Sequence, residues 1–170
     1  AVKYADQLAK QSRTLGITVE QLQEYTFAAE RSGVSTEEMV KGLQQFNKFV
    51  GQAARGTGTA KVAFEDMGIS LTDMKGNLRP SNVLIDEFVE KMSGIESPAM
   101  RAGLAADVFG RAGVKLLPMM GQGKEGLDAL KKAAHEMGNV MANETAAKAE
   151  VLNDKLDTFT TALKTKFYSA

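Results

Sequence analysis

Two glycine-rich stretches carry the residue types that a phosphate-binding loop needs. The first, Gly121–Gly126, reads G-Q-G-K-E-G and matches the G-x-G-x-x-G pattern of dinucleotide loops. Such a loop lies between a strand and a helix, and a carboxylate about 20 residues later binds the ribose. Pro118 interrupts the apolar residues just before it and would break a central parallel strand. The pattern therefore indicates a glycine-rich corner that precedes a helix, and a nucleotide site is the less favoured interpretation.

The second stretch, Gly51–Thr57, resembles a phosphate loop, but the lysine that should follow Gly56 is missing. No β-branched strand precedes it. Its glycines and small residues predict a flexible connection, the most mobile loop of the chain. We assign no cofactor to either stretch.

Residues for proton transfer, nucleophilic attack or metal binding are scarce. The chain has one histidine, His135, and no cysteine, which excludes disulfides, a cysteine nucleophile and zinc sites that need two histidines. We expect His135 to be a surface or half-buried side chain of a helix. Adjacent acidic residues such as Asp86 and Glu87 diverge by about 100° on a helix, so they suit solvated faces. We assign no catalytic, cofactor-binding or metal-binding residue.

The composition indicates the elements that position these residues. Among 170 residues, Ala, Leu and Met total 47, whereas Val and Ile total 16, which predicts an all-α fold. The 21 basic and 21 acidic side chains are spread evenly. Specific nucleic-acid binding is not expected, because it needs a basic stripe. No apolar run approaches the roughly 18 residues of a transmembrane helix.

Two helix starts repeat the same capping chemistry. Thr18 and Gln21 form a capping box, and Ser35 and Glu38 have the same spacing. A glycine precedes each of them, Gly16 or Gly33 in turn, and suits the left-handed end of the helix before. These signals predict tight helix–helix corners within one compact domain of short helices.

Further helices follow from apolar residues that recur on one face, between positions 39 and 50, 60 and 67, 85 and 92, and 127 and 137. Ser97 and Pro98 read as an N-cap and a first helical residue. Residues 69–80 form the one stretch without helical periodicity. Within 69–79, the turn residues Lys75–Asn77 allow a tiny hairpin or an irregular turn.

The two ends, about residues 1–15 and 143–170, predict longer helices with heptad-like spacing. The later seam consists of Leu152, Leu156, Phe159 and Leu163, and is a candidate protein contact. It allows self-association through the terminal helices. Packing of either terminal helix onto its own core is an equally good alternative. We expect residues 1–170 to form a single helical module of a longer, largely helical protein.

Several short strings, each weak alone, follow one another in a specific order between Ala5 and Leu163. They are Ala5-Asp6-x-Leu8-Ala9-Lys10, Leu15-Gly16-Ile17-Thr18-x-Glu20-x-Leu22-Gln23, Ala28-Ala29-x-x-x-Gly33-Val34-Ser35, Gly56-Thr57-Gly58-x-Ala60, Met67-Gly68-Ile69-Ser70-Leu71, Gly76-Asn77-Leu78-Arg79, Phe109-Gly110-Arg111-x-Gly113-x-x-Leu116-Leu117-Pro118 and Glu125-Gly126-Leu127. In this order, and most of all over Phe109–Pro118, the chain resembles the tail tape-measure (minor tail) proteins of tailed bacteriophages and prophages.

The resemblance implies a long helical protein that occupies the lumen of the tail tube during assembly, sets the length of the tail and leaves before the DNA. It implies the tail tube protein, tail assembly chaperones and tail-tip proteins as partners. It places the protein in the virion tail, and in the host bacterial cytoplasm during assembly. Some relatives carry peptidoglycan-cutting domains, but no residues for such an activity can be assigned here, so we expect no enzyme. The alternative is a generic bacterial helical scaffold or adaptor domain that binds partner helices.

Overall fold

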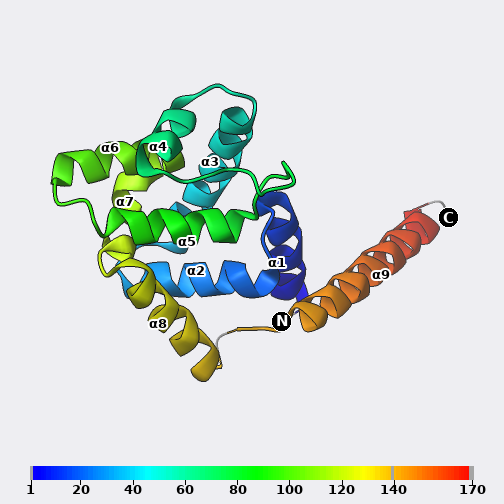
Figure 1. Ribbon diagram of the computed structural model, residues 1–170. Helices are drawn as coiled ribbons and strands as arrows, with labels where there is room; N and C mark the ends of the chain where they lie inside the picture. Colours follow the sequence, from blue (N-terminus) through cyan, green and yellow to red (C-terminus); the bar gives the residue numbers. More distant parts are fainter. Residues whose placement is uncertain (1, 139, 169–170) are drawn as a thin grey trace.

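The fold is all-α, as the composition predicts. The computed structural model describes residues 2–138 and 140–168, and the described part contains no β-strand. The helices are α1 (Val2–Leu15), α2 (Val19–Arg31), α3 (Thr36–Ala54), α4 (Thr59–Met67), α5 (Ser81–Met92), α6 (Pro98–Phe109), α7 (Gly113–Met120), α8 (Gly123–Glu136) and α9 (Asn143–Tyr168), with a 3-10 turn at Gly110–Ala112 between α6 and α7. Helices α1 to α8 form a compact body from which α9 projects (Figure 1).

The two predicted corners are present, and one of them differs in detail. The Thr18 capping box is complete, since the Thr18 hydroxyl accepts from the Gln21 N–H and the Gln21 side chain accepts from the Thr18 N–H. The Ser35 hydroxyl accepts from the Glu38 N–H at 3.1 Å. The Glu38 carboxylate pairs with Lys115 of α7 at 2.9 Å instead of closing a second box. The corner therefore also ties α3 to α7.

The non-helical stretch between α4 and α5 contains the tiny hairpin that its turn residues allow. Thr72 and Leu78 form an isolated antiparallel bridge. The Asp73 N–H donates to the Asn77 carbonyl at 2.8 Å, and the Arg79 N–H donates to the Leu71 carbonyl at 2.8 Å. This short turn packs no sheet and lies on the outside of the body.

The prediction of a flexible connection over Gly51–Thr57 is wrong in its first half. Helix α3 continues to Ala54, so Gly51 is helical. A glycine inside a helix costs about 1 kcal/mol, and the buried neighbours Val50 and Ala53 hold this turn against the core. The real loop between α3 and α4 spans residues 55–58.

Four phenylalanines from four helices form the centre of the core. Phe46 of α3 stacks on Phe109 of α6 with ring centroids 5.1 Å apart. Phe64 of α4 meets Phe46 edge-on at 6.3 Å, and Phe88 of α5 meets Phe109 edge-on at 5.6 Å. All four side chains are fully buried. This cluster joins α3, α4, α5 and α6 into one body.

The corner between α6 and α7 contains two glycines with different roles. Gly110 has φ +70° and ψ −155°, a combination that other residues rarely adopt. Gly113 has ordinary helical angles, but a Cβ there would lie 2.1 Å from the Ala105 carbonyl oxygen. Helix α7 therefore approaches the backbone of α6 as closely as a glycine permits. Met119 and Met120, at the other end of α7, are buried in the core.

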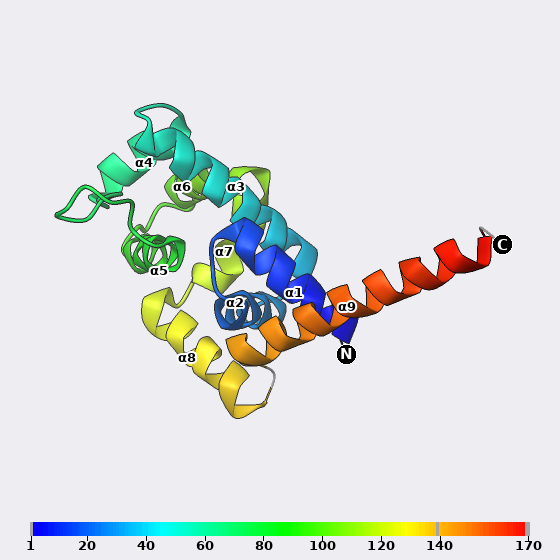
Figure 2. The ribbon, with the colours of Figure 1, turned by 90° about the vertical axis from the view of Figure 1, so that its right-hand side faces the viewer.

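The two terminal helices differ in whether they pack onto the core of their own chain or leave their seam exposed. Helix α1 packs onto its own core through Leu8 and Leu15. Helix α9 runs antiparallel to α1 along its first half and then extends beyond the body (Figure 2). Only the N-terminal helix is thus a conventional part of the core.

Candidate functional site

The predicted contact seam lies on the exposed side of α9. Leu152, Leu156 and Phe159 are 48%, 50% and 63% exposed, and Val151 beside them is 55% exposed. The fourth predicted residue, Leu163, has its side chain outside the described part of the structure. We call Val151, Leu152, Leu156 and Phe159 the apolar stripe. It is a protein-contact candidate because these side chains point away from the body that they would otherwise stabilise.

Helix α9 turns a polar side toward α1. The Arg13 guanidinium donates to the Glu150 carboxylate in a bidentate pair, with Nη1 2.8 Å from Oε2. One helical turn further, the Lys10 ammonium lies 3.8 Å from the Asp154 carboxylate. Ion pairs at a surface contribute little stability each. These pairs therefore determine which face of α9 is turned toward α1, and they add little to the strength of its attachment.

A half-satisfied buried carboxylate lies in the middle of this contact. Asp6 is 7% exposed, and its Oδ2 accepts from the Asn153 amide at 2.9 Å and from the Lys10 ammonium at 3.0 Å. Its Oδ1 is buried without a hydrogen-bond partner. Ala146 is the fully buried residue among the described side chains of α9. The attachment of α9 is therefore mainly polar.

We expect this attachment to weaken in acid. The hydrogen bond from Arg13 lowers the pKa of Glu150 below its ordinary 4.5. A carboxyl whose pKa is lower in the folded state contributes stability above its unfolded pKa and loses it as the pH falls through the folded value. The distribution of distances between a spin label on α9 and one on α2 should therefore broaden below about pH 4.5. In Glu150→Gln, the remaining broadening should be smaller. An unchanged distance down to the pH of global unfolding would contradict this.

The linker before α9 is held by side-chain pairs that span more than a hundred residues. The Gln23 amide donates to the Met141 carbonyl and accepts from the Met141 N–H, both at 2.9 Å. The Asn143 side chain accepts from the Glu20 N–H at 2.9 Å, and the Glu20 carboxylate accepts from the Asn143 N–H at 3.4 Å. The N-termini of α2 and α9 thus cap each other. This arrangement sets where α9 starts.

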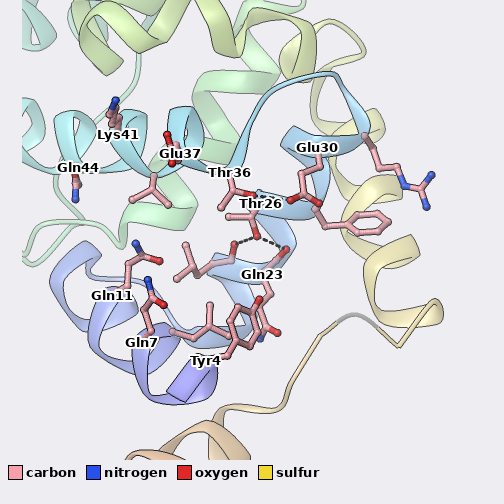
Figure 3. Close-up of a pocket in the computed structure, with 15 residues that line it drawn as sticks. Tyr4, Gln7, Gln11, Gln23, Thr26, Glu30, Thr36, Glu37, Lys41 and Gln44 are labelled. Carbon is pink, nitrogen blue, oxygen red and sulfur yellow. Dashed lines mark hydrogen bonds between the residues drawn. The ribbon is translucent and has the colours of Figure 1, made fainter. Parts of the chain in front are cut away.

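A groove of about 720 Å³ lies between α1, α2 and α3 (Figure 3). Its floor contains apolar side chains of all three helices together with polar side chains of α2, and its walls carry amide and charged side chains of α1 and α3. The floor includes Leu8, Leu22, Thr26, Phe27 and Val40, and the walls include Gln7, Gln11, Glu37, Lys41 and Gln44. We call it the α1–α3 groove. Its size is in the range of binding sites, and no sequence pattern indicated it.

One polar cluster inside the body has a structural role. The buried Tyr25 hydroxyl donates to Asp86 at 2.9 Å, and the Lys131 ammonium donates to both Asp86 oxygens at 2.8 Å. Burial raises the pKa of the Tyr25 phenol far above its ordinary value, and the Asp86 charge adds to this. The phenol therefore stays protonated as a donor. The cluster links α2, α5 and α8.

The other residues whose types could take part in chemistry have structural or surface positions in the fold. Helix α7, and no strand, precedes Gly121, and Gly123 opens α8 with φ +69°, so the glycine pattern is a corner. His135 has a 47% exposed side chain, with Nε2 3.8 Å from a Glu24 oxygen. Glu87 diverges from Asp86 and pairs with Arg79 at 2.5 Å. The described residues contain no group of three or more His, Asp or Glu placed to hold a metal ion.

Comparisons with known proteins identify a family but no close relative. A family model described as phage-related minor tail protein matches residues 3–110, from α1 to the corner after α6. No curated protein and no solved structure shows a significant match. Within the described part of the chain, no helix has the length and apolar character needed to cross a membrane. The family match covers the α1–α3 groove and ends before α9.

Proposed function

Because the chain belongs to the phage-related minor tail protein family, we propose that it is a structural module of a tail tape-measure protein. In this role it contributes to tail assembly and to the determination of tail length inside the tail tube. The family match over residues 3–110 carries the proposal, since it covers the helices that form most of the folded body. The order of short strings along the sequence supports the same reading.

The proposal includes partners and locations. The tail tube protein, the tail assembly chaperones and the tail-tip proteins are the proposed partners. The module acts in the virion tail, and in the host cytoplasm during assembly. It works through contact surfaces rather than through an enzymatic reaction. In support of this, Tyr25, Asp86 and Lys131 bond to one another in a cluster that links α2, α5 and α8, which is a structural role.

The folded chain and the same chain extended inside a tail tube differ greatly in length. The folded body has a radius of gyration near 15 Å, hence a diameter of about 40 Å, and the second half of the 26-residue α9 projects roughly 20 Å beyond it. The same chain as one continuous helix would span roughly 255 Å. We propose that the module folds when free, and that it either lies compact at one end of the tail or is pulled open within the tube. Glycine corners such as Gly16 and Gly33 support folding of the free chain.

Deleting residues 1–170 in frame from the parent protein tests this role. If the module is extended in the tube, tails should shorten by roughly 255 Å in electron micrographs. If it is a folded terminal module, the length should change by at most about 60 Å, the sum of the body and the projecting half of α9. Both results support a role in the tail.

An in-frame duplication of the module is the matched control. It should lengthen tails by the amount that the deletion shortens them, because tail length then follows chain length. Normal, infectious tails of unchanged length after the deletion, together with absence of the segment from wild-type virions, would overturn the proposal.

A further inference from the structure

Two surfaces of this chain lack an intramolecular partner, and both combine apolar with polar side chains. One is the apolar stripe on the projecting part of α9, and the other is the α1–α3 groove. We propose that α9 of one copy docks into the α1–α3 groove of a second copy, so that the chain associates head to tail. This inference does not depend on the tape-measure role.

Both surfaces are amphipathic. The apolar lining of the groove consists of Leu8, Leu22 and Phe27, which are buried, and Val40, which is partly exposed. Polar and charged side chains form the rest of the lining. On α9, Leu156 and Phe159 form the centre of the outer face, and the polar residues Lys155 and Thr160 flank them at helical spacing. An amphipathic helix that lies in a groove places its apolar residues on the floor and its flanks against the walls. The stripe and the groove fit that mode of recognition.

Charge gives the contact an orientation. Lys155 beside the stripe is exposed, and Glu37 on the groove wall is exposed. Neither forms an ion pair among the described residues. A docked α9 can bring the Lys155 ammonium toward the Glu37 carboxylate. Such a rim pair favours one direction of the helix in the groove more than it adds affinity.

The chain's own α9 cannot reach the groove, so an α9 that occupies the groove comes from a second copy. Helix α1 presents Asp6, Lys10 and Arg13 to its own α9, and it presents Gln7 and Gln11 to the groove. These sets lie on different sides of α1. Beyond Asp154, α9 leads away from the groove, and both ribbon views show nothing beside it (Figures 1 and 2). Two different surfaces meet in this contact, so a docked pair can add a further copy.

Mixing two variants of the 170-residue chain tests the proposal. The arm variant carries Leu156→Glu and Phe159→Glu, and the groove variant carries Gln7→Arg and Gln44→Arg. All four positions are exposed, so both variants should keep the wild-type circular dichroism spectrum. We expect the wild type to associate with concentration in sedimentation, and each variant alone to associate at least tenfold more weakly. An equal mixture should form a one-to-one dimer, because one variant supplies the intact groove and the other the intact α9.

Two further measurements make the outcome decisive. Val62→Glu, on an exposed position of α4, is the matched control and should associate like the wild type. A photo-crosslinker at position 159 should react with α1, α2 or α3 of another copy. If the groove variant associates as strongly as the wild type, or the crosslinks join α9 to α9, the helices pair with each other and the proposal is wrong. A wild type that stays monomeric at about 500 μM also overturns it, since the helix-in-groove mode then lacks the affinity to act.

Discussion

Replacing Gly113 with alanine is expected to lower the free energy of unfolding by about 3 kcal/mol, the upper part of the range for overpacked positions. The new Cβ would lie 2.1 Å from the Ala105 carbonyl oxygen and 2.5 Å from its carbon. These are backbone atoms of α6, so no side-chain rotation relieves the overlap. Helix α7 must move away from α6, which also disturbs the packing of Leu116. Urea unfolding followed by circular dichroism measures the effect.

Gly103→Ala is the matched control for this prediction. Gly103 lies in α6, the helix that Gly113 approaches, and a Cβ at Gly103 would meet no atom within 4 Å. Alanine is about 1 kcal/mol more favourable than glycine inside a helix, so this variant should be slightly more stable than the wild type. The two substitutions are chemically identical and should act in opposite directions. Equal effects would show that the close approach of α7 to α6 is not what Gly113 provides.

Phe46→Ala should cost about 3–5 kcal/mol, a large part of the stability of a typical domain. Phe46 is fully buried and contacts Phe64 and Phe109, so its removal leaves a cavity between α3, α4 and α6. The cavity is lined by rings that cannot close it without moving their helices. The midpoint of thermal unfolding should fall accordingly.

Phe159→Ala is the corresponding control. The Phe159 ring is 63% exposed on α9, so its truncation should change the free energy of unfolding by less than about 0.5 kcal/mol. Both measurements belong at a low protein concentration, where association does not contribute. A large loss in Phe159→Ala would mean that α9 packs on the body more tightly than its exposed side allows.

The sequence predicts the helix corners well because their chemistry is local. A Thr18 hydroxyl and a Gln21 amide three residues apart satisfy free N–H groups wherever the chain lies, and the structure contains this box. Gly16 follows the same logic at the end of α1, where its φ is +68°. Such signals need no knowledge of the rest of the fold.

Where tertiary packing decides, the sequence is a poorer guide. The composition around Gly51 suggests a loop, but burial of Val50 and Ala53 extends α3 through it. The close approach at Gly113 has the same character. Helical angles alone do not require a glycine there, and only the position of Ala105 explains it. Both Gly51 and Gly113 depend on contacts between helices, which the spacing of apolar residues along the sequence does not reveal.

The candidate site divides in the same way. The apolar stripe is visible as a seam in the sequence, because Leu152, Leu156 and Phe159 repeat with helical spacing. The polar side that α9 turns toward α1 is not visible, since Arg13 and Glu150 are 137 residues apart. The groove combines side chains of three helices and has no pattern of its own.

The pairing of α1 with α9 also sets an order of events during synthesis. A ribosome adds about 5–20 residues per second, so Glu150 emerges roughly 7–27 s after Arg13. During that interval, the side of α1 that later meets α9 is open to water and to chaperones. That side carries Lys10 and Arg13, and its one buried acid, Asp6, already has Lys10 as a partner on the same helix. The nascent chain therefore waits for its last helix with a hydrophilic surface, which offers neighbouring nascent chains little to adhere to.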